Sequence, residues 1–404
     1  MREAMNNKGY TLIELVVVMA VFLIVIMISS YAFQNIVKRA GQQGRAAETG
    51  VAGMVGLEMM RTDIGHAGYG LPWSFQATPP AYKEIDDGNL PASGLIDTTT
   101  FDNFRDVPPS VPRAIVSGTG SVSSTTNAGI DYLVVKGVVV GMSPAAKRWN
   151  FVNYSGGNHS TFRSKGDSTT DLVNGDLVVT LSSKFSTTGD ETRQLLVDSG
   201  NANNYYYTAA GVPNVGTANA AFQPTDSTQT VVAYGINTGA IRMPYNRADF
   251  YVDKGAAKPK SCASGTGVLY KAVANHAGGF TQYPLLDCVG DMQVVYDRDI
   301  NGDGNLTPID ESTITTLTAD LIRSQIKDVH VYILTHEGKQ DPNFSYPPLD
   351  ATNAVCVAPY SGSTCISSVG RMWTQAAMAS TFGANWKNYR WKVYSFTVTL
   401  KNLQ

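Results

Sequence analysis

The sequence contains few charged residues and no excess of either sign. Of its 404 residues, 16% are Asp, Glu, Lys or Arg, the formal net charge is -2 and the pI is about 6.2. Nucleic-acid-binding domains concentrate positive charge on one face, but no basic cluster extends beyond Lys38-Arg39. The composition therefore gives no strong nucleic-acid signal. A hydrophobic share of 43% together with 38 glycines also excludes a disordered chain and predicts a globular protein with many turns.

The common motifs of enzymes are missing as well. The sequence has no Gly-x-Ser-x-Gly elbow, phosphate-binding P-loop, His-Glu-x-x-His motif or Gly-x-Gly-x-x-Gly fingerprint. His336-Glu337 lacks the second histidine of a zinc protease, and the five histidines are scattered along the chain. We therefore expect a protein without enzyme activity.

Cysteine is scarce, and its spacing argues against a zinc site. The four cysteines lie well past the middle of the chain, and none belongs to a Cys-x-x-Cys pair. In an exported chain they predict two disulfides, for which three connectivities exist. We expect the pairing between sequence neighbours, Cys262 with Cys288 and Cys356 with Cys365. The alternative is that they are unpaired thiols in the core.

One long apolar run stands out against these absences. Residues Tyr10–Phe33 contain a single charge, Glu14, and at about 1.5 Å per residue they form a helix roughly 36 Å long. An ordinary secretory signal has a shorter apolar region, followed by its cleavage site, whereas a short polar segment, residues 1–9, precedes this run. The run predicts a transmembrane helix. Glu14 either has a specific partner or lies near the helix start, where its side chain reaches the membrane surface.

The segment Lys8–Leu15, with the sequence KGYTLIEL, closely resembles the class III signal of type IV prepilins and pseudopilins. The resemblance implies cleavage after Gly9 by a prepilin peptidase, N-methylation of the new N-terminal residue Tyr10, and a role for Glu14 in assembly. Most family members have Phe at the position of Tyr10. Glu14 of one subunit would neutralise the Tyr10 amine of a neighbour, because a displaced subunit would leave a buried charge unpaired.

The chain is expected to have four parts. Residues 1–9 are the leader, 10–33 the transmembrane and assembly helix, 34–68 the continuation of that helix, and 69–404 a β-rich globular domain with two possible lobes. Glycines in the continuation weaken the helix by up to about 1 kcal/mol each. They also provide small residues for a close-packed helix face.

Short strand-like runs recur through the globular part, among them MQVVY from Met292 and VHVYILT from Val329, and the clearest is the alternating WKVYSFTVTL near the C-terminus. One long helix and many short strands predict an α+β fold, in which the helix packs on an antiparallel sheet. Residues 71–129 read as long loops with a few short strands. Residues 187–229 read as an excursion from the sheet, in which Tyr205–Tyr207 form either a contact surface or a packed edge.

Four further segments make the resemblance more specific. Together and in their order they resemble segments of the PilW-like minor pilins of type IV pilus machines: RTDIGHAGYG, YPLLDCVGDMQVVYDRD, IRSQIKDVHVYILTH and YRWKVYSFTVTLKN. This resemblance covers most of the globular part and excludes residues 71–129 and 187–229.

A calcium site is predicted in the loop Asp299–Asp310, DINGDGNLTPID. Oxygen-bearing residues occupy positions one, three and five of an EF-type loop, Gly304 occupies the turn at position six, and an aspartate stands at position twelve. The expected ligands of a structural Ca²⁺ are Asp299, Asn301, Asp303, Asn305, Thr307 and Asp310. An upstream strand replaces the first EF-hand helix, and position twelve has Asp in place of Glu. The alternative is a turn rich in Asn, Asp and Gly without a metal.

The sequence thus predicts a minor pilin that co-assembles into a type IV pilus or primes its assembly. Its partners would be major and minor pilins, prepilin peptidase and the inner membrane, and any adhesion partner is unknown. Lys and Arg flank the apolar run on both sides, so the periplasmic location of the C-terminal domain follows from the leader and the cysteines. The alternatives are a minor pseudopilin of a type II secretion system and a pilus-tip adhesin or DNA-uptake subunit.

Overall fold

The structure is a computed structural model, and it describes residues 11–403 except 86–103, 120–128, 157–159, 186–190, 199, 202 and 216–219. The chain divides into two compact units, Met1–Val51 and Ala52–Gln404. Helix α1 (Leu12–Gly65) begins in the first unit and ends in the second. Its end at Gly65 lies three residues before the end expected for the helix continuation, residues 34–68.

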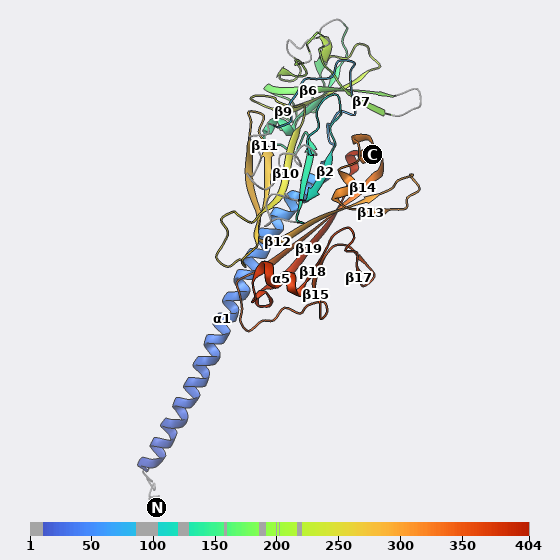
Figure 1. Ribbon diagram of the computed structural model, residues 1–404. Coiled ribbons are helices and arrows are strands. Elements are labelled where there is room, and N and C mark those ends of the chain that lie inside the picture. Colours follow the sequence, from blue (N-terminus) through green and yellow to red (C-terminus); the bar gives the residue numbers. More distant parts are fainter. Residues whose placement is uncertain are drawn as a thin grey trace, which may run out of the picture. The chain divides into compact units, whose positions relative to one another are not determined.

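The larger sheet of the second unit is antiparallel throughout. Its strands follow the order β19-β14-β12-β11-β10-β3-β2, and β13 pairs with β12. Figure 1 shows β12, β14 and β19 running side by side. The strands are β2 (Ile115–Thr119), β3 (Asp131–Gly137), β10 (Asn246–Asp253), β11 (Gly267–Ala274), β12 (Phe280–Arg298), β13 (Thr307–Ile309), β14 (Ile326–Glu337) and β19 (Arg390–Thr399).

A second sheet has the order β1-β7-β6-β9-β4-β5, and β8 pairs with β6. Only the short β1–β7 pair among its described strands is parallel. Its strands are β1 (Ser74–Phe75), β4 (Trp149–Asn153), β5 (Thr161–Phe162), β6 (Asn174–Phe185), β7 (Glu191–Leu195), β8 (Tyr207–Ala210) and β9 (Thr230–Asn237). Two small ribbons pair β15 (Asn353–Val357) with β18 (Arg371–Thr374), and β16 (Tyr360–Ser361) with β17 (Thr364–Cys365).

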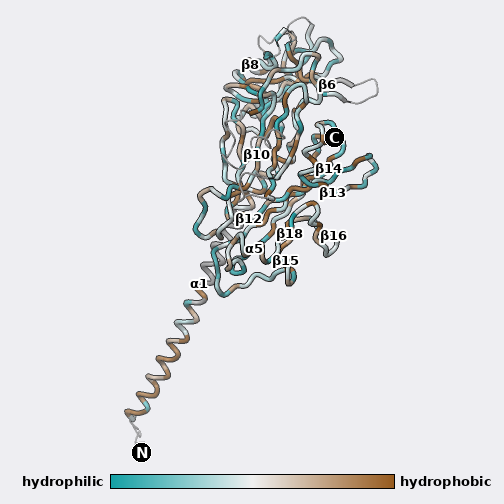
Figure 2. Tube along the Cα trace, viewed as in Figure 1, coloured by the Kyte–Doolittle hydropathy of each residue, from teal (hydrophilic) through white to brown (hydrophobic). Residues whose placement is uncertain are grey.

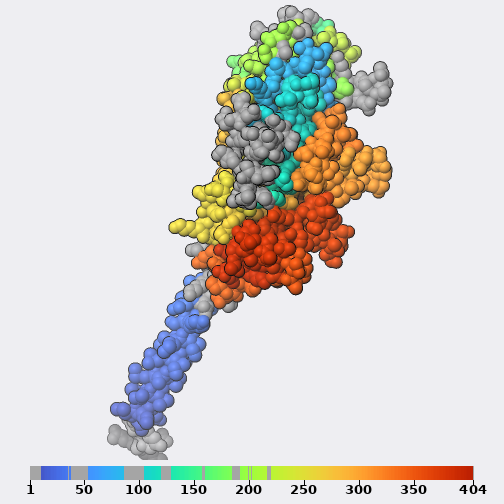
Figure 3. Space-filling model, viewed as in Figure 1, coloured from blue at the N-terminus to red at the C-terminus, as the bar shows by residue number. Residues whose placement is uncertain are grey.

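Short helices and 3-10 turns lie between the strands, and the three short α-helices among the described residues belong to the C-terminal quarter of the chain. The α-helices are α3 (Glu311–Ile314), α4 (Ala319–Gln325) and α5 (Gln375–Phe382), and the 3-10 turns are η2 (Pro144–Lys147), η3 (Ala220–Phe222), η4 (Trp386–Asn388) and η5 (Lys401–Leu403). The orange and red atoms of the C-terminal part adjoin on the face shown in Figure 3.

The main hydrophobic core combines the end of α1 with residues of both sheets. Leu57, Met60 and Ile64 of α1 are buried there beside Leu181 and Val294, which come from the two different sheets. Each sheet also contributes to a smaller cluster of its own. The two possible lobes therefore correspond to two sheets that share one core.

The excursion expected at residues 187–229 contains more regular structure than the sequence suggested. Its β7 and β8 pair with β6 in the second sheet. Tyr205 and Tyr207 are 3% and 9% exposed, which agrees with packing and excludes an exposed tyrosine surface at these two positions. Polar residues in these short strands concealed the pairing, because strand stability depends on cross-strand contacts more than on intrinsic preference.

Candidate functional site

The start of α1 is closed by reciprocal hydrogen bonds between Thr11 and Glu14. The main-chain N–H of Glu14 donates to Thr11 Oγ1 at 3.3 Å, while the N–H and hydroxyl of Thr11 donate to Glu14 Oε2 at 3.1 and 3.2 Å. The N–H of Leu15 donates to the carbonyl of Thr11 at 3.3 Å, so Thr11 is the N-cap. This arrangement is a capping box, which satisfies N–H groups that have no partner inside the helix.

The capping box gives Glu14 a local role that the sequence analysis missed. Its signature, a threonine followed three residues later by a glutamate, is visible at Thr11–Glu14. Within the described residues, the hydrogen bonds of the Glu14 carboxylate use Oε2 alone. The predicted cleavage and methylation residues, Gly9 and Tyr10, lie outside the described residues.

The helix segment that follows is apolar and exposed. Leu12–Gln34 has a mean hydropathy of 3.0 and is long and apolar enough to cross a membrane, judged by length and composition. Its large apolar side chains are between 46% and 82% exposed in the isolated chain, and Figure 2 shows the brown colour of this part of α1. Such a surface needs lipid or other apolar helices around it.

The end of α1 packs closely on β12 through glycines. A Cβ atom added to Gly56 would lie 2.2 Å from the carbonyl oxygen of Leu285, and one added to Gly53 would lie 2.6 Å from Leu286 Cδ1. An ion pair of 2.6 Å between Asp63 Oδ2 and Lys271 Nζ of β11 adds a second attachment. In the sequence these glycines suggested a close-packed face against other helices, whereas Gly53 and Gly56 face the chain's own sheet.

The predicted calcium loop forms a sequence of tight turns. Asp299 accepts hydrogen bonds from the N–H groups of Gly302 at 2.8 Å and Gly304 at 3.1 Å. Asp303 accepts from the N–H of Asn305 at 2.8 Å and from the Asn301 amide at 3.0 Å. Gly302 and Gly304 have φ angles of 75° and 82°, which explains why glycine occupies these positions.

The end of the loop is tied to the following helix. Asp310 is the N-cap of α3, and its Oδ1 accepts from the N–H of Thr313 at 3.1 Å and from two neighbouring hydroxyl groups. Thr307 lies in β13 and pairs with Arg298. The described part of the chain contains no group of three or more His, Cys, Asp or Glu side chains placed to hold a metal ion. Asp299, Asn301 and Asp303 therefore lie together in the tight turns of the loop, whereas Asp310 caps the N-terminus of α3.

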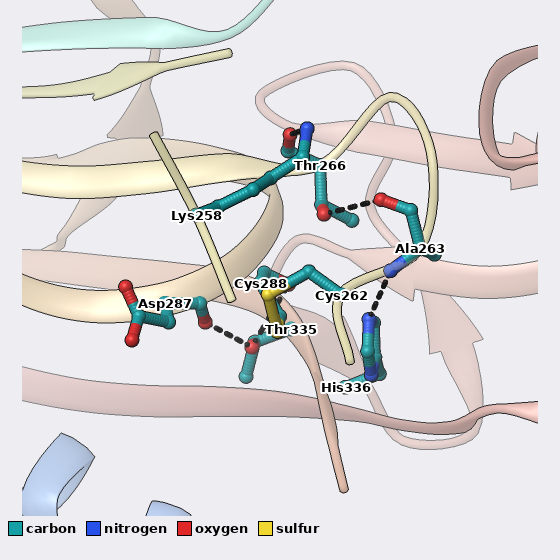
Figure 4. The surroundings of a disulfide bond; sticks show 8 residues. All are labelled: Lys258, Cys262, Ala263, Thr266, Asp287, Cys288, Thr335 and His336. Atoms are coloured by element: carbon teal, nitrogen blue, oxygen red, sulfur yellow. Dashed lines mark hydrogen bonds between the residues drawn. A yellow bond between two sulfur atoms is a disulfide. The ribbon is translucent and has the colours of Figure 1, made fainter. Parts of the chain in front are cut away.

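The four cysteines form two disulfides between sequence neighbours. Cys262 is joined to Cys288 with a Cα–Cα distance of 4.9 Å, and Cys356 is joined to Cys365 with a distance of 6.1 Å. Figure 4 shows the first bridge close to residues of β14, among them His336. Burial lowers the pKa of His336 to about 4, so this ring is neutral at pH 7.

A buried network of charges connects distant parts of the second unit. Lys136 Nζ lies 2.7 Å from Glu84 Oε1 and also contacts Asp106, while Arg247 contacts Glu84 at 2.9 Å and Asp249 at 2.6 Å. Burial opposes the ionisation of the Asp106 carboxyl. The positive charges of Lys136 and Arg113 nevertheless keep the pKa of Asp106 below its ordinary value. No local motif identifies this network, because Glu84 and Arg247 are far apart in the sequence.

Comparison with known proteins bears on the N-terminal segment. The family described as the prokaryotic N-terminal methylation motif matches residues 4–30. The chain carries a prepilin methylation motif. The match includes Gly9, Tyr10 and Glu14 and extends into the apolar part of α1. It points to a pilin-like, structural protein without enzymatic function.

Two further comparisons concern the chain as a whole. No curated protein matches the sequence. A solved structure of a type IV-like pilin from Thermus thermophilus has 12% sequence identity and a TM-score of 0.18, over 39% of this chain and 69% of that one. A likeness this loose has no bearing on function.

Proposed function

We propose that this chain is a PilW-like minor pilin, which co-assembles into a type IV pilus or primes its assembly through α1. The observation that carries the proposal is the prepilin methylation motif over residues 4–30, which runs directly into the exposed apolar segment Leu12–Gln34. The ordered sequence segments that resemble PilW-like proteins support the narrower assignment.

The apolar segment has two successive environments in this proposal. It first anchors the subunit in the inner membrane, with the C-terminal domain in the periplasm. After leader removal by prepilin peptidase, it packs against the helices of major and minor pilins in the filament. Lipid chains and a helix bundle are both apolar, so packing and polar contacts decide between the two environments.

Glu14 supplies the polar contact. Its capping-box bonds use Oε2, and we assign Oε1 to the methylated amine of Tyr10 in a neighbouring subunit. An ion pair in an apolar environment is strongly disfavoured when one partner is missing. The pair therefore sets the axial position of each subunit in the filament.

Two substitutions separate the charge of Glu14 from its capping role. Glu14→Ala removes both, whereas Glu14→Gln removes the charge and keeps a side chain that suits this position of a capping box. We expect both variants to enter the membrane and to be cleaved normally. Both should reduce pilus number and co-purification with other pilins to a similar extent, because only the charge pairs with the amine.

The measurement compares surface pili, co-purified pilins and leader processing in cells that carry wild type, Glu14→Gln or Glu14→Ala. Near-normal assembly with Glu14→Gln and a defect with Glu14→Ala would show that Glu14 matters as a helix cap. Normal assembly with both variants would contradict the filament role and favour a membrane-anchored domain that works alone.

A minor pseudopilin of a type II secretion system is the second candidate, because the same methylation motif suits it. Affinity purification of the membrane-bound chain distinguishes the two. Co-purified pilins support the first function, and co-purified pseudopilins support the second. A tip adhesin or DNA-uptake role would be a specialisation within the first.

We also infer a structural calcium ion in the loop Asp299–Asp310. The oxygen-bearing side chains of Asp299, Asn301 and Asp303 and the left-handed glycines support it. Asn305 and Thr307 would add a main-chain carbonyl and a hydroxyl or water ligand. Asp310 completes the proposed ligand set from the N-cap of α3. The ion would hold β12, β13 and α3 together.

A further inference from the structure

Strand β12 is irregular where the end of α1 packs on it. Along β11, Leu269 pairs with Leu286 but the next residue, Tyr270, pairs with Pro284, and a further shift separates the Leu269 pair from that of Gly267 with Val289. The pairing with β14 shifts between Val289 and Asp291. Bulges of this kind turn the main chain and its carbonyl groups out of the regular pleat.

Cys288 adopts a strained conformation within this irregular segment. Its φ angle of 57° is the only positive value among the non-glycine residues that the structure describes. A residue with a Cβ atom enters this region only at a cost of free energy, so its surroundings must hold it there. Two features do so: the disulfide to Cys262, and the Thr335 hydroxyl, which donates to the carbonyls of Asp287 and Cys288 at 3.1 Å each.

The other end of the disulfide is anchored as well. The N–H of Ala263, next to Cys262, donates to Nε2 of His336 at 2.8 Å, and Thr266 Oγ1 donates to the carbonyl of Ala263 at 2.7 Å. Figure 4 shows that two consecutive residues of β14 hold the two ends of the bridge: Thr335 bonds to the segment of Cys288, and His336 bonds to Ala263, the neighbour of Cys262. The disulfide therefore joins the bulged segment to a loop that β14 already holds.

The C-terminal part of α1 also packs on this bulged segment of β12. Leu285 and Leu286, three and two residues before Cys288, are the residues that Gly56 and Gly53 contact. At Gly56 the limiting contact is with the Leu285 main chain, and a main-chain carbonyl cannot move away as a side chain can. The position of this carbonyl thus decides whether α1 fits.

We propose that the Cys262–Cys288 disulfide positions the β12 bulge and thereby forms the docking surface for residues 53–65 of α1. The proposal rests on the function proposed above, in which α1 is the assembly helix. Subunits become competent for assembly when two thiols are oxidised outside the cytoplasm. The two thiols give two electrons and two protons to a disulfide of a periplasmic thiol oxidant, which is reduced to two thiols.

Without the bond, Cys288 relaxes toward negative φ and shifts the Leu285 carbonyl from the position on which Gly56 packs. The helix end then separates from the sheet more often. Hydrogen exchange measures this separation, because amides of a helix exchange faster when it undocks. The readout uses the purified full chain in detergent and does not depend on whether the chain enters a filament.

The test compares amide exchange of wild type, Cys262→Ser/Cys288→Ser and the matched control Cys356→Ser/Cys365→Ser. We expect at least tenfold faster exchange at residues 53–65 in the first variant, and wild-type exchange there in the control. Strands β6 and β9 report global stability and should change little. A third variant, Cys262→Ser/Cys288→Gly, should restore part of the protection, because glycine accepts the φ angle of the bulge.

Unchanged exchange at residues 53–65 after loss of Cys262–Cys288 would overturn the proposal. Equal acceleration in both double-serine variants, or acceleration in β6 and β9 as large as in α1, would also overturn it and leave a general stabilising role. If the exchange result holds but Glu14 variants assemble normally, the docking role stands and the filament function fails.

Discussion

Gly56 illustrates how a single residue determines the packing of α1. Glycine is unfavourable inside a helix by about 1 kcal/mol relative to alanine, yet here the missing Cβ leaves room for the Leu285 carbonyl. Gly65 lies in the same helix, but a Cβ there would make an ordinary contact of 3.6 Å with Val398 Cγ1. The same substitution, glycine to alanine, should therefore affect the stability of the chain differently at these two positions.

We predict that Gly56→Ala lowers the stability of the full chain by about 1 to 3 kcal/mol, because overpacking outweighs the gain in helix preference. Gly65→Ala should leave stability unchanged or raise it slightly. Thermal unfolding of both variants in the same detergent measures the difference. Equal melting temperatures for the two would show that α1 does not depend on close contact with β12.

The buried charge network makes a second prediction at this scale. Lys136 is completely buried between Glu84 and Asp106. We predict that Lys136→Ala costs about 3 to 5 kcal/mol, because it removes the buried cation that Glu84 and Asp106 share and leaves only arginines beside these carboxylates. Lys392, whose side chain is 52% exposed beside Glu337, is the control, and Lys392→Ala should cost at most about 1 kcal/mol. A similar small loss from both substitutions, measured by denaturant unfolding, would contradict the structural role of the network.

At the scale of elements, the loop Asp299–Asp310 combines the proposed metal binding with the capping of α3 by Asp310. We predict that calcium raises the melting temperature of wild type and that chelator lowers it, because a ligand that binds the folded state stabilises it by mass action. Asp303→Ala should abolish this response. Asp310→Ala should lower the melting temperature even in chelator, where no calcium is bound. The reason is the loss of the α3 N-cap, which contributes about 1 kcal/mol to the free energy of unfolding.

Elemental analysis of the purified chain provides the independent measurement. One bound calcium in wild type and none in Asp303→Ala would agree with the proposed site. Identical melting curves with calcium and with chelator, together with no bound metal, would assign these residues to a turn without an ion.

The elements also show what the sequence could and could not predict. The apolar half of α1, the strands β12, β14 and β19, and the local cysteine pairing follow from composition, alternation and short separation in the chain. The pairing of β7 and β8 with β6 was not predicted, because β7, with the sequence ETRQL, has little apolar alternation and β8 has only four residues. The close contact of Gly56 with β12 depends on a bulge that leaves no local sequence pattern. The capping box at Thr11 was visible in the sequence but was missed.

At the scale of the whole molecule, the chain combines two units with different requirements. Met1–Val51 contains an apolar helix that needs lipid or neighbouring helices, and Ala52–Gln404 contains a folded domain with its own core. The methylation motif lies entirely in the first unit. Processing at the N-terminus should therefore change assembly without changing the fold of the second unit.

The last prediction follows from this division: the mature chain begins at N-methylated Tyr10. Cleavage after Gly9 would remove a polar segment that contains Arg2 and Lys8, so the apolar helix would no longer carry these two basic side chains at its N-terminal end. Methylation keeps the new amine basic and available to Glu14 of a neighbour.

Intact-mass measurement of membrane and pilus fractions should find only the cleaved, singly methylated chain in wild-type cells. Cells without prepilin peptidase should retain residues 1–9 and keep the chain in the membrane, with the disulfides and melting temperature of the second unit unchanged. Retention of Met1 in wild-type pili, or a mature end at another residue, would show that the motif is not processed as proposed.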